Sequence, residues 1–176
     1  ITYPSGFRIS AERSPNLKGM NDVSGEILED ISSAITNQSI RGIYILDDGV
    51  DRELDDSWKT LLENMDFVIV QTYAMTELAK LAKIVLPGLA PFEREGTITN
   101  DQGRVQWLRP SIPIKGESKP DWEILMLVRN ALQKDSEQFA DLGEVIKRMS
   151  DQFPDYAGVS LFKIGAMGIA VNGKNT

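Results

Sequence analysis

The sequence predicts an α/β fold: a Rossmann-like parallel sheet with helices on both faces, plus a long irregular excursion at about 87–120. Short, continuous apolar runs rich in β-branched residues alternate along the chain with amphipathic helical patterns. Strands of a parallel sheet covered on both faces are expected to be apolar throughout. Their alternation with helices is typical of βαβ units with right-handed crossovers.

The predicted strands of this sheet are three apolar runs at 42–46, 67–70 and 84–86, the last of which ends at Pro87. We also expect strands near 105–108 and 7–9. Between the runs, apolar residues recur at helical spacing, and the first two patterns follow a residue whose side chain can accept a hydrogen bond from the first turn. The helical patterns and their predicted caps are 27–35 with Ser24, 54–65 with Asp51, and a shorter one at about 76–82.

The second half of the chain begins with the excursion, which is rich in proline and glycine. Two helices are predicted after it. The first is capped by Ser118, has Pro120 in its first turn and continues to Leu132; the second covers 139–149. The tail from Gly165 is small and glycine-rich, so we expect it to be loosely held. We treat 1–176 as a single fragment of a larger domain.

The composition excludes several classes of function. The chain has no cysteine and no histidine, so it cannot ligate an iron–sulfur cluster with thiolates or assemble a Ser-His-Asp triad. Its formal net charge of −7 argues against a surface for nucleic acid or anionic lipid. No apolar run is long enough to span a bilayer.

Candidate chemistry lies where the predicted strands end, because ligands of open parallel sheets bind beyond the carboxyl ends of the strands. Those ends carry Asp47-Asp48-Gly49 and Gln71-Thr72-Tyr73. Neither is a glycine-rich phosphate-binding fingerprint. The aspartates could hold a divalent metal, but two adjacent carboxylates without further ligands favour a polar turn. The run Glu93-Arg94-Glu95 is read as solvated charge rather than as a hydrolytic carboxylate pair.

One stretch is more specific than any of these. Residues 66–106 contain Asp-Phe-Val-Ile-Val-Gln, then Thr-Glu-Leu-Ala and Ile-Val-Leu-Pro, then Glu-Gly-Thr-Ile-Thr-Asn and Gly-Arg-Val-Gln, and 115–125 contain Lys-Pro-Asp-Trp-Glu-Ile-Leu. Both resemble the pattern of the molybdopterin oxidoreductase family in order and spacing. Within that family, 14–25 and the Pro-Asp-Tyr-Ala-Gly-Val-Ser segment at 154–160 are similar to the large iron–sulfur subunit of bacterial NADH:quinone oxidoreductase (complex I), in its C-terminal part.

The resemblance implies a structural, non-catalytic module of a respiratory NADH dehydrogenase. Its partners would be the rest of the parent subunit, which carries iron–sulfur clusters, and the other subunits of the complex. The location would be the cytoplasmic peripheral arm of a membrane-bound assembly, with no direct membrane insertion and no nucleic acid. Because the preceding half of the domain would be missing, the fragment is also expected to self-associate through uncovered apolar surface.

Departures from the family pattern bear on the cofactor. In the catalytic members of the family that this chain resembles, a Gly-x-Asn-Pro loop after the corresponding strand holds the guanine dinucleotide of the cofactor. After the predicted strand at 42–46, this chain has Asp47-Asp48-Gly49-Val50 instead. We therefore expect no catalytic residue, no metal and no pterin cofactor in this segment. The residues that would line a vestigial pocket are Asp47, Asp48, Gly49, Gln71, Thr72, Thr76, Lys83, Asn100 and Arg104.

Two alternatives stay open. The first is that the chain is the pterin-binding piece of a formate dehydrogenase-like molybdenum enzyme. The second is an unrelated α/β domain that binds a small molecule.

Overall fold

The computed structural model describes residues 16–24, 31–133 and 137–171. The chain divides into two compact units. We call residues 27–94 and 110–136 the parallel-sheet unit, and residues 1–26, 95–109 and 137–176 the hairpin unit. Among the described residues, none of the helices has the length and apolar character needed to cross a lipid bilayer.

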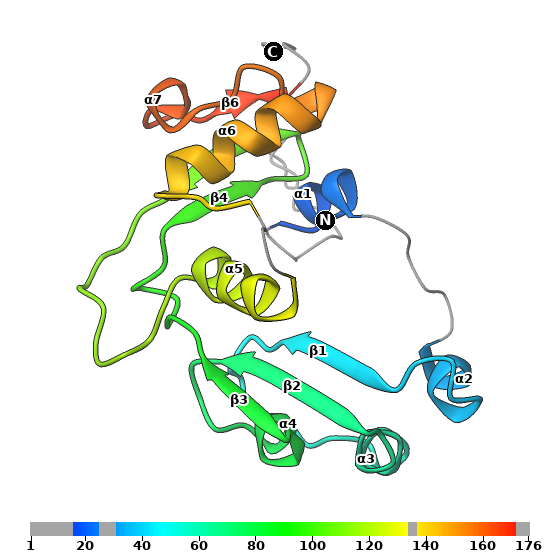
Figure 1. The fold of residues 1–176 in the computed structure, drawn as a ribbon. Coiled ribbons are helices and arrows are strands. Elements are labelled where there is room, and N and C mark those ends of the chain that lie inside the picture. The colour runs from blue at the N-terminus through cyan, green and yellow to red at the C-terminus, as the bar shows by residue number, and fades with distance from the viewer. Residues whose placement is uncertain (1–15, 25–30, 134–136, 172–176) are drawn as a thin grey trace, which may run out of the picture. The chain divides into compact units, whose positions relative to one another are not determined.

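The parallel-sheet unit is built on the three predicted strands. They are β1 (Gly42–Leu46), β2 (Phe67–Thr72) and β3 (Ile84–Pro87), and they lie in the order β1-β2-β3. Both pairs are parallel, with Ile43 opposite Val68 and Val70 opposite Val85. Parallel pairing of consecutive strands confirms the predicted βαβ units (Figure 1).

Helices lie on both faces of this sheet, as the sequence predicts. Figure 1 shows α3 (Asp56–Glu63) and α4 (Glu77–Leu81) on one side of the strands and α5 (Asp121–Leu132) on the other. A short α2 (Ile31–Thr36) precedes β1. The buried core combines residues of α2, α3 and α4, the residue Met65 just after α3, and two residues of β2: Ile35, Leu62, Met65, Val68, Val70 and Ala79.

The helix starts differ in part from their predicted caps. Asp55, not Asp51, caps α3, and its Oδ1 accepts from the Ser57 amide at 2.8 Å. Asp51 lies too far ahead of α3 to cap it, because that helix begins only at residue 56. Pro120, not Ser118, stands at the N-cap of α5 and makes no side-chain cap bond.

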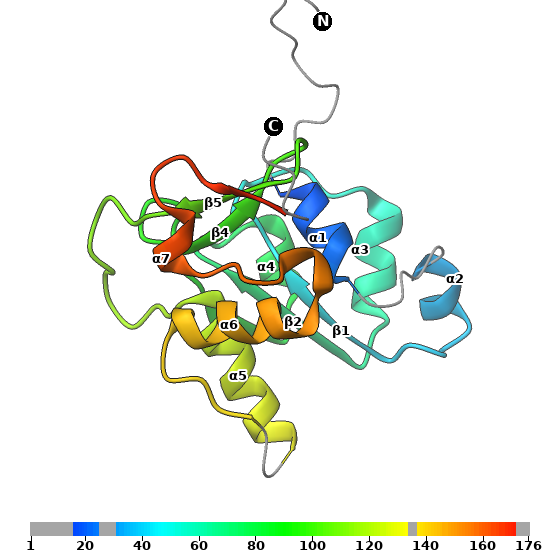
Figure 2. The ribbon, with the colours of Figure 1, turned by 90° about the horizontal axis from the view of Figure 1, so that it is seen from above.

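The hairpin unit pairs its strands in antiparallel fashion. Within it, β4 (Gly96–Thr99) and β5 (Arg104–Leu108) form a hairpin, and β5 also pairs with β6 (Ile169–Ala170). Figure 2 shows β4 and β5 side by side. The remaining elements of the unit are α1 (Leu17–Val23), α6 (Leu142–Gln152), the 3₁₀ helix η1 (Pro154–Tyr156) and α7 (Leu161–Ile164).

Two expectations are corrected in this unit. The stretch 87–120 is not irregular throughout, because its middle forms the hairpin of β4 and β5. The tail is held as far as Val171, whose amide donates to the Gly103 carbonyl at 2.8 Å. Ser24 stands at the C-terminal end of α1, where its hydroxyl donates to the Met20 carbonyl, and the start of the helix that it is predicted to cap lies outside the described residues. The strand expected at 7–9 lies outside the described residues.

Candidate functional site

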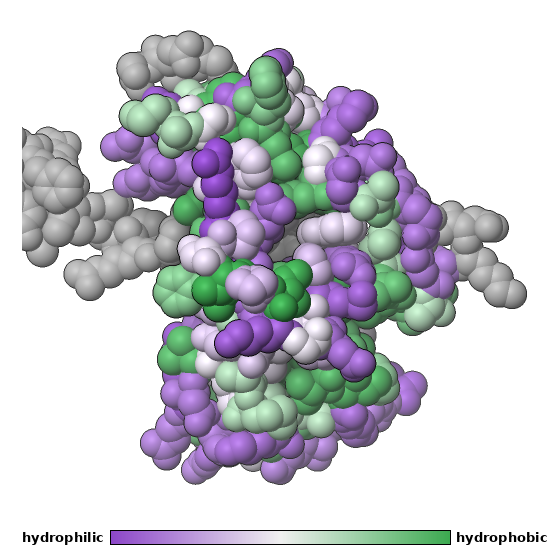
Figure 3. Space-filling view, turned by 90° about the vertical axis from the view of Figure 1, so that its left-hand side faces the viewer, coloured by the Kyte–Doolittle hydropathy of each residue, from purple (hydrophilic) through white to green (hydrophobic). Residues whose placement is uncertain are grey.

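The loops that follow β1, β2 and β3 meet at one edge of the parallel sheet, which we call the carboxyl edge. Six of the predicted pocket residues lie on or beside it: Asp47, Asp48 and Gly49 after β1, and Gln71, Thr72 and Thr76 at and after the end of β2. Gln71, Thr72 and Thr76 are all buried. The side of the molecule towards which these strands point carries hydrophilic residues interspersed with hydrophobic ones (Figure 3).

The start of α4 is already occupied by the chain's own side chains. The Thr76 hydroxyl donates to Asp47 Oδ2 at 2.8 Å and accepts from the Ala79 amide at 3.1 Å. Asp51 Oδ1 accepts from the Glu77 amide at 2.9 Å. Two of the first-turn amides that a phosphate would seek at such a helix start are therefore satisfied by Thr76 and Asp51.

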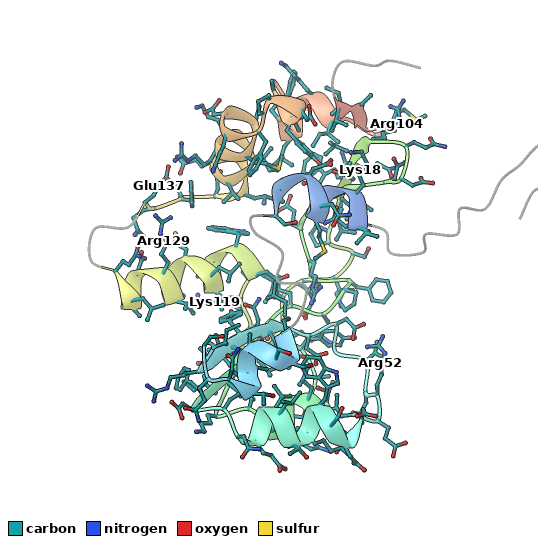
Figure 4. All side chains as sticks on the ribbon, turned by 90° about the vertical axis from the view of Figure 1, so that its right-hand side faces the viewer. Lys18, Arg52, Arg104, Lys119, Arg129 and Glu137 are labelled. Carbon is teal, nitrogen blue, oxygen red and sulfur yellow. The ribbon has the colours of Figure 1, made fainter. Side chains whose placement is uncertain are left out.

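Asp48 is neutralised locally. Its two carboxylate oxygens accept from Arg52 Nη1 and Nη2, each at 2.8 Å, and Oδ1 also accepts from the Val50 amide. These bonds lower the pKa of the Asp48 carboxyl below its ordinary value, with the Arg52 bond as the largest cause. Arg52 lies on the loop that leads into α3 (Figure 4). The bidentate pair leaves little of either charge free for a ligand.

Because Gly49 has no side chain, the ring of Tyr73 can approach its backbone more closely than any other residue at position 49 would allow. Its φ of +72° is in the left-handed region, and a Cβ placed there would lie 2.3 Å from Cε1 of Tyr73. The Tyr73 ring therefore packs directly against the Gly49 backbone. The ring is 37% exposed, so an aromatic surface remains open at the edge.

Behind the edge lies a chain of polar groups centred on Gln71. The Tyr44 hydroxyl donates to Gln71 Oε1, and Gln71 Nε2 donates to Asp121 Oδ1 at 2.6 Å. Burial raises the pKa of Tyr44, and the negative charge of Asp121 adds to the effect. Gln71 and Asp121 belong to the two sequence segments that carry the family resemblance, and this bond shows that they act on one another.

Arg94 is a residue of this edge that the sequence reasoning missed. Its Nε donates to the Leu89 carbonyl at 2.7 Å and lies 4.0 Å from Asp121 Oδ2, and its guanidinium stands 5.9 Å from the centre of the Tyr73 ring. The pattern Glu-Arg-Glu reads as solvated charge in the sequence, since only the fold brings Arg94 beside Tyr73 and Asp121.

The neighbouring Glu93 is also not solvated. It is buried, and its carboxylate accepts from the amides of Ala90 and Lys115 at 3.0 and 3.1 Å. Glu93 thus links the segment just after β3, which contains Ala90, to the later segment that contains Lys115. These bonds also hold the loop that carries Arg94.

Lys83 lies at the opposite end of the sheet. It precedes β3, its amide donates to the Val68 carbonyl, and its Nζ donates to the Asp66 carbonyl. Strands of a parallel sheet run in one direction, so a residue before β3 is separated from the carboxyl edge by the length of the strand. Lys83 therefore does not supply charge at that edge.

Asn100 and Arg104 belong to the hairpin unit. Asn100 Oδ1 accepts from the amides of Gln102 and Arg104, which closes the turn between β4 and β5. The Arg104 guanidinium donates to the carbonyls of Met167 and Gly168 and so holds the approach to β6 (Figure 4). Within the unit, both residues have structural contacts.

A buried tyrosine holds the hairpin unit together. The Tyr156 hydroxyl donates to Asp22 Oδ2 at 2.9 Å and lies 3.1 Å from Thr99 Oγ1, and Lys18 pairs with Asp22. Burial raises the pKa of Tyr156 to about 12. The hydroxyl thus ties α1, β4 and η1 at a single point.

No cluster of three or more carboxylates suited to a metal ion occurs in the described parts of the chain. What the carboxyl edge does offer is a set of acceptors at Asp47 and Asp48, an exposed aromatic ring at Tyr73 and a cation at Arg94. Such a mixture can recognise a ligand that combines hydrogen-bond donors, a flat ring and negative charge.

The family described as molybdopterin oxidoreductase matches residues 11–130. The chain is 36% identical over 112 residues to the alpha subunit of the F420-dependent formate dehydrogenase 2 of Methanococcus maripaludis, covering 61% of this chain and 16% of that protein.

Two further relatives are a putative formate dehydrogenase of Staphylococcus haemolyticus and one of Staphylococcus aureus. They are 30% and 32% identical over 145 residues, which is 80% of this chain and 14% of each relative. The chain thus spans about one seventh of the length of these proteins.

These relatives correct the finer part of the sequence interpretation. They are named as formate dehydrogenases, two of them as putative ones, whereas the sequence was interpreted as a non-catalytic module of an NADH:quinone oxidoreductase. That reading was wrong, and with it the NADH dehydrogenase subunits as partners and the peripheral arm as location lose their support. It rested on short segments at 14–25 and 154–160, the second of which lies outside the residues that the family matches.

Proposed function

This chain belongs to the molybdopterin oxidoreductase family, and we propose that it is the pterin-binding piece of a formate dehydrogenase-like molybdenum enzyme. The names of its relatives support the reaction class. The carboxyl edge of the parallel sheet supports the role within that enzyme, because this is where an open parallel sheet receives a nucleotide-like ligand. Other subunits are expected as partners, since one relative is an alpha subunit.

The residues at the edge fit the guanine end of a pterin dinucleotide. The base presents N–H donors from its ring and its amino group, and carboxylates are acceptors only. Where β1 ends, Asp47 Oδ1 has no hydrogen bond among the described residues, since Thr76 donates only to Oδ2. Asp48 can accept only through lone pairs that Arg52 and Val50 leave free, and Arg52 balances its charge. The exposed ring of Tyr73 offers a surface for stacking.

When bound, the molybdenum–pterin group supplies the redox chemistry that accepts electrons from formate. The part of this chain is to hold and orient the nucleotide end. Gly49 keeps the loop close to Tyr73, Thr76 fixes the carboxylate of Asp47, and Gln71 fixes the start of α5 through Asp121. Held in this way, the side chains need little reorganisation on binding.

The observation that carries the proposal is the position of Asp47 and Asp48 beside Tyr73 at the carboxyl edge of a family member's sheet. The test uses the intact parent subunit. We expect near-stoichiometric molybdenum by elemental analysis, pterin fluorescence after oxidation, and formate-dependent reduction of a dye.

In the parent, the double change Asp47→Asn and Asp48→Asn is expected to lower pterin content severalfold, because amides no longer offer acceptors alone. The matched control is Asp66→Asn at the opposite end of the sheet. A parent subunit purified without molybdenum and pterin would contradict the proposal and would favour the earlier expectation that the segment holds no cofactor.

A further inference from the structure

We propose that Arg94 binds a phosphate group of the nucleotide ligand at the carboxyl edge, next to the ring of Tyr73. The inference rests on the proposed function and adds to it the place of the phosphate. It also assigns a role to a residue that the sequence pattern leaves as surface charge.

The other places for a negative group at this edge are taken. The start of α4 is closed by Thr76 and by Asp51, which accepts from the Glu77 amide. Both terminal nitrogens of Arg52 donate to the carboxylate of Asp48. Lys83 is at the far end of the sheet.

Arg94 is held so that its terminal nitrogens stay available. Its described hydrogen bond is made by Nε, to the Leu89 carbonyl at 2.7 Å, and no described hydrogen bond reaches Nη1 or Nη2. Its side chain is 29% exposed, so the charge is screened less than that of a fully exposed arginine. A guanidinium offers two parallel donors that match phosphate oxygens.

The surroundings fix the direction of the guanidinium. Asp121 Oδ2 lies 4.0 Å from Arg94 Nε, and the other oxygen of Asp121 is held by Gln71. At 4.0 Å, Asp121 Oδ2 attracts the Arg94 guanidinium without making a short hydrogen bond to it. Gln71 and Asp121 are therefore positioning residues, and Arg94 is the group that contacts the ligand.

The placement gives the bound nucleotide a direction. Acceptors for the base stand at the end of β1, whereas the cation stands in the loop after β3, with Tyr73 at the end of β2 between them in strand order. The base would lie towards β1 and the phosphate towards β3.

The test measures nucleotide binding to the 176-residue chain by NMR titration at low ionic strength. Guanosine diphosphate, inorganic pyrophosphate and guanosine are the three probes. For the wild-type chain we expect saturable binding of both phosphorylated probes. Arg94→Gln should weaken both by about tenfold, the loss expected for one charge-assisted contact, and leave guanosine unchanged.

Two further variants make the result specific. Arg94→Lys keeps the charge and should recover part of the affinity, and Lys83→Gln removes the same charge at the other end of the sheet and should change nothing. Unaltered resonances away from the edge show that each variant is folded. Equal affinity of wild type and Arg94→Gln for the diphosphate, or no binding of either phosphorylated probe at millimolar concentration, would overturn the inference. The proposed function is tested separately, by the molybdenum and pterin content of the intact parent subunit.

Discussion

Gln71 Nε2 and Asp121 Oδ1 lie 2.6 Å apart, and this hydrogen bond joins the end of a buried strand to the first residue of a helix fifty positions later. Gln71 also accepts from the Tyr44 hydroxyl, so its amide has a partner on both sides. A side chain that is only 2% exposed needs such partners, because an unpaired buried amide is costly.

Replacing Gln71 with Met should therefore destabilise the chain. The change keeps the volume but leaves the Tyr44 hydroxyl and Asp121 without a partner, at a cost of about 1–3 kcal/mol. Urea unfolding followed by circular dichroism measures it. Gln102→Met in the exposed turn of the hairpin is the control, with an expected change within about 0.5 kcal/mol. If the two variants were equally stable, Gln71 would not be an organising residue.

Gly49 should tolerate alanine far less well than Gly116 does. Both have a left-handed φ, +72° and +67°, but a Cβ at 116 meets nothing within 4 Å whereas one at 49 meets the Tyr73 ring. Gly116→Ala should cost about 1 kcal/mol for the backbone alone. Gly49→Ala should cost about 1–3 kcal/mol more.

Thermal unfolding of the two variants makes this comparison. Adding Tyr73→Ala to Gly49→Ala removes the obstacle and should restore most of the difference. A double variant no more stable than Gly49→Ala alone would show that the clash is relieved in some other way.

Tyr156 makes the stability of the chain depend on alkaline pH. Its pKa is raised from 10.0 to about 12, so the folded state keeps the hydroxyl proton that the unfolded state loses first. The contribution is complete below pH 10 and is lost as the pH rises towards 12. Tyr156→Phe should lower the unfolding free energy by about 1–2 kcal/mol at neutral pH.

The difference between the wild type and Tyr156→Phe should then shrink above pH 10, as measured by urea unfolding at each pH. Taking the difference cancels the titration of the lysines and the other tyrosines. A difference that stays constant up to pH 12 would show that the hydroxyl proton is not held by the fold.

The sequence was most informative where structure is local. The strands at 42–46, 67–70 and 84–86 were predicted within two residues, because a strand covered on both faces is apolar over its whole length. In the hairpin at 96–108, the strand expected near 105–108 is confirmed as β5. Its partner β4 was missed, since Gly96–Thr99 is short and is defined by its pairing with β5.

The site was predictable only in part. Asp47, Gln71 and Thr76 follow from the rule that ligands bind at the ends of parallel strands. Arg94 does not, because its spatial neighbours Tyr73 and Asp121 lie more than twenty residues away in the sequence, one before it and one after it. No local sequence pattern predicts these contacts. Lys83 was misplaced for the converse reason: it is near β3 in sequence but at the wrong end of it.

Self-association remains a prediction, and the parallel sheet suggests where it would occur. Phe67 and Ile84 are 44% and 40% exposed, and they alternate with Val68 and Val85, which pack on the core side. Phe67→Ser with Ile84→Ser should reduce the association of the chain in light scattering.

The control for that experiment is Phe162→Ser, which replaces an aromatic ring that is 96% exposed in the hairpin unit. A wild-type chain that is strictly monomeric at high micromolar concentration would refute the prediction. An equal effect of the control would indicate non-specific hydrophobic association rather than association through the sheet.

The hairpin unit draws on three separate stretches of the chain, and its last strand, Ile169–Ala170, pairs with β5. A ribosome adds roughly 5–20 residues per second, so several seconds separate the emergence of β5 from that of its partner. During this interval one edge of β5 stays open to a foreign strand. The order of synthesis thus exposes the hairpin unit, rather than the parallel sheet, to mispairing in a nascent chain.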